Sequence, residues 1–203
     1  MILHTGMRTD IPAFYAPWFV NRLRAGEVCV RNPYDGQQVT RYLLDPHVVD
    51  LIAFCTKNPA PMLPYMDLLA PFGQLWYVTI TPYGRDIEPH VPAWEEVARA
   101  FRQLSAIVGV RAVGWRYDPI IIDERHSIDW HRRKFAMMAE ELAGATEMVV
   151  ISFLMRYAKT RRNFPESREV THAERMELGA YIVETARAHG MTAYLCGGGE
   201  ELA

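Results

Sequence analysis

Several short apolar runs of the sequence are followed directly by charged or amide side chains. Arg8, Thr9 and Asp10 come after the first run, and later runs end in the same way. In parallel α/β folds the strand ends that carry such residues gather at one rim, where ligands bind. The full set of candidates consists of Arg8, Thr9, Asp10, Lys57, Asn58, Arg85, Arg116, Tyr117, Asp118 and Arg161.

These candidates include the two kinds of group that acid–base chemistry on an anionic substrate needs. Carboxylates can act as acid and base, while Arg and Lys bind carboxylate or phosphate through charge-assisted hydrogen bonds. We therefore predict catalytic roles for Asp10, Asp118 and Lys57, and substrate binding by the remaining candidates. We also expect Arg116 to form an ion pair with Asp10 or Asp118, because cations in a partly desolvated pocket need partners.

The same residue types also form turns. Asn58 and Asp118 directly precede prolines, and Asp10 is separated from Pro12 by one residue. Proline fixes its own φ and biases the residue before it toward an extended conformation, so these steps could serve loop closure alone. The candidates nevertheless contain more ionisable groups than loop closure requires, which favours a polar pocket of mixed charge.

The elements that must position these residues follow from the hydrophobic pattern. Short apolar runs alternate with helical patterns, which is typical of βαβ units, and Asp35–Gly36 predicts an inserted β-hairpin near residues 27–44. We predict one α/β domain over residues 1–203, a partial (β/α) TIM-like barrel of about six parallel strands rather than a doubly wound sheet. The predicted strands are 1–4, 50–55, 74–80, 111–116, 147–153 and 191–195, and the predicted helices are 13–25, 61–70, 93–108, 127–143 and 171–189.

Aromatic and histidine residues are first interpreted as structural. We expect Phe14 to anchor the first helix on the sheet and Trp18 to pack in the core rather than to stack on bases. His126, Asp129 and His131 resemble a metal-binding cluster, but the two histidines lie on different faces of the predicted helix. Surface histidines explain them more simply, and we predict no metal site.

The charge, the cysteine spacing and the length of the apolar runs argue against several classes of protein. The chain has 22 basic and 24 acidic residues among 203, so its charge gives no reason to expect non-specific nucleic-acid binding, and any such contact would need a local patch. Its three cysteines are far apart, which suits a reducing cytoplasm. No segment approaches the length of a membrane-spanning helix. We expect a cytoplasmic protein whose partner is a small anionic ligand.

Six blocks of the sequence resemble a known family. They are RTDIPAFYAPWFVNRLRAGEVCVRNPY, FCTKNPAPM, TITPYGRDIEP, WRYDPII, DWHRRKFAMMAEEL and VISFLMRYAKTRRN. In this order they are similar to a bacterial domain-of-unknown-function family that begins with R-R-T-D-I-P-A-F and is related to the radical-SAM barrel enzymes, among them spore photoproduct lyase. The resemblance implies a radical-SAM-like partial barrel. It also implies that relatives hold a [4Fe-4S] cluster and S-adenosylmethionine through a cysteine-rich C-terminal segment, which we expect this chain to lack.

Three functions remain open from the sequence. The first is a radical-SAM-type enzyme whose strand ends bind cofactor and substrate. The second is a cluster-independent hydrolase or lyase in which Asp10 and Asp118 act as acid and base. The third is a binding module for a small phosphorylated or carboxylated ligand. No cofactor is assigned to this chain from its own residues.

Overall fold

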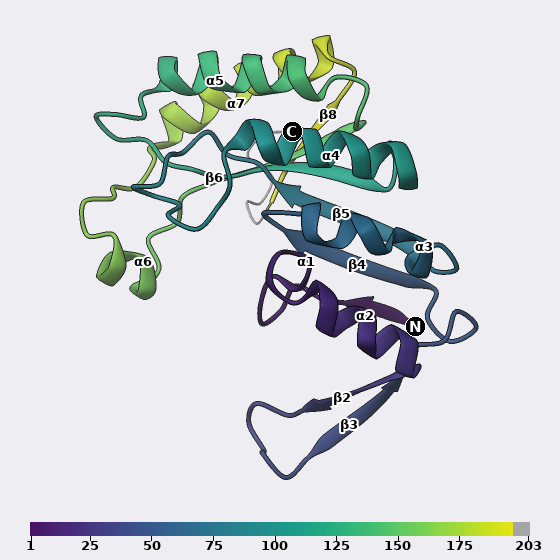
Figure 1. Ribbon diagram of the computed structural model, residues 1–203. Helices are drawn as coiled ribbons and strands as arrows, with labels where there is room; N and C mark the ends of the chain where they lie inside the picture. Colours follow the sequence, from purple (N-terminus) through teal and green to yellow (C-terminus); the bar gives the residue numbers. More distant parts are fainter. Residues whose placement is uncertain (197–203) are drawn as a thin grey trace.

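Six parallel strands form the centre of the computed structural model, which describes residues 1–196 (Figure 1). Along the sheet the strands follow one another in chain order, interrupted only by a separate hairpin of β2 and β3. The run Gly197–Gly199 and the residues after it lie outside the described part. The six strands are β1 (Ile2–His4), β4 (Leu51–Thr56), β5 (Gly73–Thr79), β6 (Val113–Ile120), β7 (Met148–Phe153) and β8 (Thr192–Leu195).

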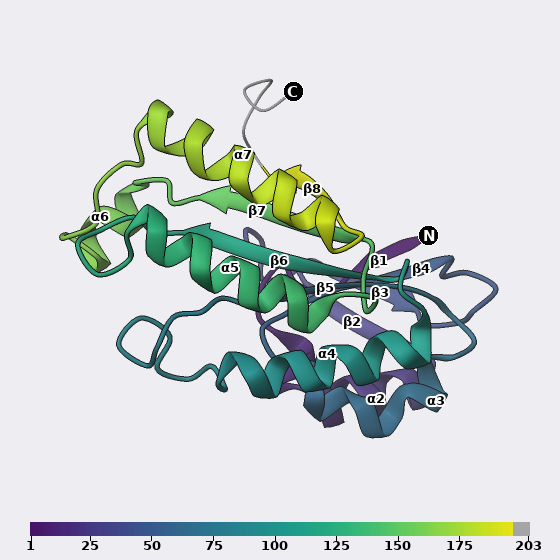
Figure 2. The same cartoon turned by 90° about the horizontal axis from the view of Figure 1, so that it is seen from above.

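The connections between these strands place the helices in one layer. Strands that follow one another in a single direction, joined by right-handed crossovers, carry all their crossover helices on the same face. In Figure 1, α5 and α7 lie above the sheet and α4 and α2 lie in front of it, and Figure 2 shows the same layer from above. The helices are α1 (Ile11–Phe14), α2 (Ala16–Ala25), α3 (Met66–Leu69), α4 (Trp94–Val108), α5 (Ile128–Leu142), α6 (Ala158–Asn163) and α7 (His172–Ala188), with a 3-10 helix at Ala60–Tyr65 before α3.

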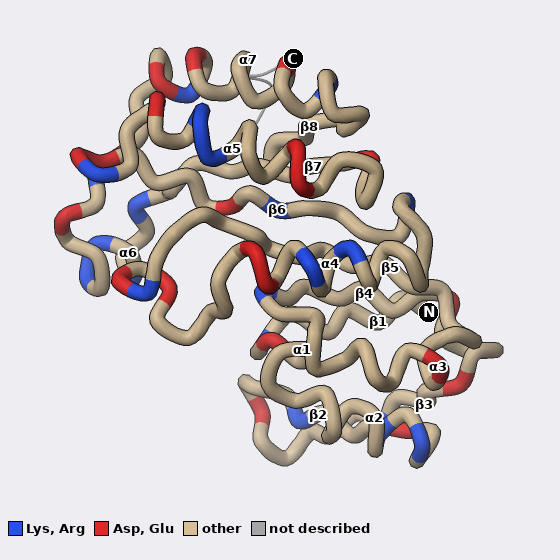
Figure 3. Tube along the Cα trace, turned by 45° about the horizontal axis from the view of Figure 1, so that its top comes forward, with Lys and Arg blue, Asp and Glu red and all other residues tan. Residues whose placement is uncertain are grey.

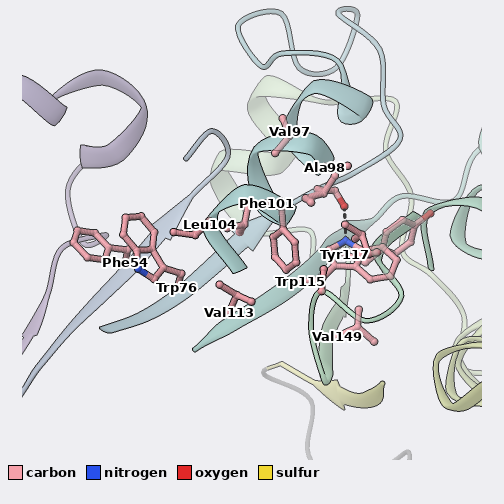
Figure 4. Close-up of a cluster of buried hydrophobic side chains, with 14 of the residues drawn as sticks. Phe54, Trp76, Val97, Ala98, Phe101, Leu104, Val113, Trp115, Tyr117 and Val149 are labelled. Carbon is pink, nitrogen blue, oxygen red and sulfur yellow. Dashed lines mark hydrogen bonds between the residues drawn. The ribbon is translucent and has the colours of Figure 1, made fainter. Parts of the chain in front are cut away.

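The buried face of the sheet carries the core. Trp76 stacks on Phe54 with ring centroids 3.9 Å apart, and Trp115 stacks on Phe135 at 4.9 Å. Trp115 also donates its indole N–H to the carbonyl of Ile80 at 2.9 Å. Figure 4 shows Phe54, Trp76 and Trp115 in one cluster with Phe101 and Leu104 of α4. The aromatic residues of the strands therefore hold the helix layer on this face.

The opposite face of the sheet is only half covered. In β7 the burial alternates strictly, with Val149, Ile151 and Phe153 buried and the residues between them half-buried. The same alternation holds over residues 75–79 of β5 and residues 115–118 of β6. Paired residues of parallel strands point to the same side, so these residues and their partners on the neighbouring strands form one continuous surface. Most of them are half-buried, whereas Ala53 is buried and Tyr194 is exposed. We call this surface the open face; it includes Leu51, Ala53, Cys55, Leu75, Tyr77, Thr79, Arg116, Asp118, Met148, Val150, Ser152 and Tyr194.

The first helical segment differs from its prediction. It is divided at Tyr15 into α1 and α2, and Phe14 and Trp18 are 65% and 45% exposed. The expectation that both would be buried is wrong, because α2 turns Phe19 and Val20 rather than Trp18 toward the core. The predicted hairpin is confirmed as β2 (Glu27–Arg31) paired antiparallel with β3 (Val39–Leu43).

The fourth core strand is longer than predicted. The strand β6 continues to Ile120, so Tyr117 and Asp118 lie within it rather than after it. The register toward β7 shifts between Tyr117 and Ile120, and this irregularity accommodates Pro119, which cannot donate to the ladder. In addition, the basic segment Ala158–Asn163 forms the short helix α6, which the sequence does not predict. No helix within residues 1–196 combines the length and the apolar character needed to cross a membrane.

Candidate functional site

An ion pair stands near the carboxyl end of the open face. Arg116 pairs with Asp118, two residues further along β6, and the second carboxylate oxygen of Asp118 accepts a hydrogen bond from the hydroxyl of Ser152 on β7. The side chains of Arg116 and Asp118 are 26% and 18% exposed, so the pair is mostly withdrawn from water. This confirms the predicted pairing of Arg116 with Asp118. The remaining guanidinium donors of Arg116 leave capacity to hold a ligand.

A thiol and an imidazole lie beside this pair on the open face. The Sγ atom of Cys55 is 3.7 Å from Nε2 of His4. Burial raises the pKa of the Cys55 thiol, while the neighbouring guanidinium of Arg116 opposes that rise and the carboxylate of Asp10 adds to it. The thiol is therefore held mainly in its neutral form, which does not favour it as a nucleophile.

Asp10 accepts hydrogen bonds from two backbone groups, and these structural contacts explain its position without a catalytic role. Its Oδ1 accepts the backbone N–H of Ala13 at 3.0 Å, which caps α1, and its Oδ2 accepts the backbone N–H of Lys57 at 2.7 Å. The carboxylate thus ties the loop after β1 to the loop after β4. Of the two carboxylates predicted to be catalytic, only Asp118 has its contacts entirely with side chains on the open face.

Replacing Asp10 with alanine should lower the free energy of unfolding by about 1 to 2 kcal/mol, because two backbone N–H groups lose their acceptor. Urea unfolding measures the change. Asp129→Ala is the matched control, since Asp129 also stands at the start of a helix but is largely exposed. A loss no greater than that of the control would show that Asp10 does not hold the two loops together.

Lys57 is held by a partner that the sequence analysis did not identify. Its Nζ lies 2.5 Å from Oε1 of Glu88, and Oε2 of Glu88 accepts the hydroxyl of Thr81 at 2.9 Å. Glu88 comes from the loop between β5 and α4. The network closes that loop over the end of β4, and it leaves Lys57 with a neutralised charge at the rim.

The other candidates do not form one cluster. Tyr117 is buried on the helix side, where its hydroxyl meets Nδ1 of His131 at 2.7 Å, so it lies outside the open face. Asn58 accepts the N–H of Ala60 and caps the following turn. Arg85 and Arg161 are exposed, and Arg161 belongs to α6, near which Figure 3 shows several basic positions. Arg8 and Thr9 line a separate groove beside β1. The structure brings together Arg116, Asp118, Cys55 and Ser152 instead.

The positions of Cys55 and Ser152 on the open face could be predicted from the sequence. Each lies two or four positions from another residue of the open face on its own strand, and the period of two in a strand puts such residues on one side. The predicted site was built from residues at the end of each apolar run, and Cys55 belongs to a run itself. Glu88 and His4 gave no comparable signal, because their partners are distant in the chain.

The histidines near α5 are structural, though they are not at the surface as predicted. His131 is fully buried, and its Nε2 lies 2.7 Å from the carbonyl of Ile121. His126 is 7% exposed and its Nδ1 lies 2.9 Å from Asp123. Both fix the loop after β6 to the start of α5. Within the described residues no three His, Cys, Asp or Glu side chains are placed so that they could hold a metal ion.

This arrangement does not fit a [4Fe-4S] cluster built from the described residues. Such a cluster needs several thiolates around one site. Cys29 lies on the hairpin, Cys55 on β4 and Cys196 after β8, and residues 1–196 provide no cluster of ligands around any of them. No step of a mechanism is therefore derived through a cluster.

Comparisons with known proteins identify a family but no described function. No curated protein and no solved structure matches the chain. One family profile matches residues 2–203, which is nearly the whole length. The chain belongs to the family described as Domain of unknown function (DUF1848).

Proposed function

We propose that the chain is a barrel-like domain that binds a small anionic ligand on the open face, at the carboxyl ends of β4, β6 and β7. The observation that carries this proposal is the half-buried pair of Arg116 and Asp118 on a sheet face that no helix covers in the described part of the chain. An ion pair that only stabilised the fold could lie on either face of the sheet. A guanidinium that is partly desolvated and still reachable is well suited to a carboxylate or phosphate.

The strand order supports the barrel-like part of the proposal. Six parallel strands follow one another in chain order, with helices in most of the connections between them. This is the succession of strand and helix that a (β/α) barrel repeats. The relation to radical-SAM enzymes rests on sequence resemblance.

The ligand would be oriented by three groups of different chemistry. Arg116 offers planar N–H donors for an oxyanion, Asp118 offers an acceptor, and Ser152 offers a hydroxyl that can donate or accept. Below them the open face is apolar, and Tyr77 lies against Gly114, where an added Cβ would stand 3.0 Å from the ring. A ligand with an anionic head and a compact apolar part matches this surface.

Thermal shift measurements with a panel of small carboxylates and phosphates test the proposal. We expect at least one compound to raise the melting temperature of the wild type in a saturable way, and Arg116→Met to weaken its binding at least tenfold. Arg116→Lys should bind more weakly than the wild type, because lysine loses the planar pair of donors. Arg111→Met is the matched control, since Arg111 is exposed at the opposite end of the sheet and pairs with Glu147.

The proposal fails if Arg116→Met binds as tightly as the wild type, or if no anion of the panel binds. A radical-SAM activity is a separate question and has its own test. Anaerobic reconstitution of the purified protein with iron and sulfide should give the brown colour of a cluster only if thiolates beyond those gathered by the described residues take part. Colourless protein that still binds the anion would favour the binding module or the cluster-independent enzyme.

A further inference from the structure

A groove separates β1 from the hairpin strand β2. Its volume is about 560 Å³, which falls within the range of ligand sites in proteins. Phe19 and Val28 are buried at its base, while Tyr15 and Trp18 stand half-exposed on its wall. We call it the edge groove; it is lined by Leu3, His4, Thr5, Met7, Arg8, Thr9, Ile11, Tyr15, Trp18, Phe19, Val28, Cys29, Val30 and Arg31.

One side of the edge groove is a free strand edge. Within residues 1–196 the strand β2 pairs only with β3. Two hydrogen bonds mark the ends of this pairing. Leu44 N–H donates to the carbonyl of Gly26 at 2.8 Å, and Asn32 N–H donates to the carbonyl of Gln38 at 2.9 Å. The backbone N–H and C=O groups of the even-numbered residues of β2 therefore point toward β3. Backbone groups alternate along an antiparallel strand. The N–H and C=O groups of Glu27, Cys29 and Arg31 therefore point away from β3.

The other side is the free edge of the main sheet. The strand β1 is the first in the sheet order, and in the described part of the chain it pairs only with β4. Thr5 donates its N–H to the carbonyl of Ala53 at 3.0 Å. By the same alternation Ile2 and His4 present their backbone groups to the outside. Two unpaired strand edges thus border a single groove that has an apolar base.

Arg8 shows that these outward groups accept hydrogen bonds. Its Nη2 donates to the carbonyl of Arg31 at 2.8 Å, which is one of the acceptors on the free edge of β2. Arg8 and Arg31 have no ion-pair partner among the described side chains. Over residues 1–31 the chain has four arginines against Asp10 and Glu27, and Glu27 is already paired with Arg41. The groove is therefore bordered by positive charge that lacks a counter-charge.

We propose that the edge groove binds an extended peptide segment with acidic side chains, which pairs with the free edge of β2 as an added β-strand. The two-stranded hairpin gains a third strand in this way, and isolated pairs of strands are only marginally stable. Alternate side chains of the segment would enter the apolar base, and carboxylates on the other side would meet Arg8 and Arg31. Strand addition at a sheet edge is a general mode of peptide recognition.

A small carboxylate is a poorer match than an extended peptide. It would use the two guanidinium groups and part of the apolar base, but it would leave the outward backbone groups of Cys29 facing the occupied groove without partners. Buried backbone groups without hydrogen bonds are costly. A segment in extended conformation satisfies the groups of Cys29, while the carbonyl of Arg31 already accepts a hydrogen bond from Arg8.

The test uses a displayed library of random dodecapeptides, selected on the full chain and followed by fluorescence titration of the enriched peptides. We expect enrichment of acidic and apolar residues in alternation. Cys29→Pro should weaken binding at least tenfold, because it removes an outward N–H without removing a bond to β3. Cys29→Ala keeps that N–H and should bind like the wild type. Replacing both Arg8 and Arg31 with Met should also weaken binding.

Hydrogen exchange keeps the test decisive if the proline variant fails to fold. In the wild type the amide of Cys29 should exchange faster than those of Val28 and Val30, and a selected peptide should slow its exchange at least tenfold. The proposal is overturned if no peptide is enriched, if peptide binding leaves the Cys29 amide unprotected, or if hexanoate alone competes fully for the groove. A dimer of the free chain that protects the same amide would assign the groove to a second copy instead.

Discussion

Replacing Asp118 with alanine should lower the free energy of unfolding by about 3 kcal/mol, because it leaves the guanidinium of Arg116 in a mostly buried position without its counter-charge. The hydroxyl of Ser152 loses its acceptor in the same variant. Both consequences concern groups that are largely withdrawn from water, where the loss of a partner is most costly. Urea unfolding at neutral pH measures the change.

A double-mutant cycle separates the pair from the two residues taken singly. Arg116→Met together with Asp118→Ala should cost less than the sum of the single variants, since neither charge is then left without a partner. The pair of Arg111 and Glu147 is the matched control, because its side chains are 86% and 56% exposed. An exposed pair of this kind should couple by less than about 1 kcal/mol. Equal coupling energies for the two pairs would show that Arg116 and Asp118 are solvated and that the open face is shallow.

The arrangement of strands and helices was predictable because it depends on local periodicity. Each of the six predicted strands and the hairpin has its counterpart in the structure. The predictions fail where contacts between distant segments determine which way a side chain points or where a strand ends. Phe14 is apolar and helical, yet the break at Tyr15 turns it outward, and no pattern within one helix reveals the direction in which a short segment points. The extent of β6 depends on its irregular register with β7, which is also a property of two segments.

The candidate site was predictable only in part, for a related reason. Asp118 and Arg116 could be proposed because they lie close together in the sequence. The backbone contacts of Asp10 and the pairing of Lys57 with Glu88 depend on loops from different βα units, and they turn two predicted catalytic groups into links between those loops. Tyr117 was included because it follows the fourth predicted strand, but it lies within β6, where successive residues face opposite sides.

Lowering the pH from 7 to about 4 should destabilise the fold by about 3 kcal/mol through His131 alone. Burial lowers the pKa of His131 to about 4, and the hydrogen bond to the carbonyl of Ile121 only partly opposes this. The geometry explains the preference for the neutral ring. A carbonyl can only accept, so Nε2 carries the hydrogen, and Nδ1 accepts the hydroxyl of Tyr117. A second proton on Nδ1 would force the hydroxyl of Tyr117 to turn from donor to acceptor and would place a charge in a buried site.

The direction of the pH effect follows from the two pKa values. In the unfolded chain His131 takes up a proton near its ordinary pKa of about 6.5, whereas in the folded protein it does so only near 4. Between these values the unfolded state binds more protons, so stability rises with pH. The stabilisation that His131 provides is complete above pH 6.5 and is lost as the pH falls toward 4. Glu174, whose pKa the hydrogen bond from Arg168 lowers to about 2, acts in a more acidic range.

Urea unfolding between pH 4 and pH 7 tests this origin of the pH dependence. The wild type should lose stability steadily below pH 6.5, and His131→Leu combined with Tyr117→Phe should remove most of that slope, because no buried ring is left to protonate. His90→Leu is the control, since His90 is exposed and its replacement should leave the slope unchanged. If the double variant kept the slope of the wild type, another group would have to be taking up the proton. The loop of Ile121 would then be held to α5 by contacts other than a neutral imidazole.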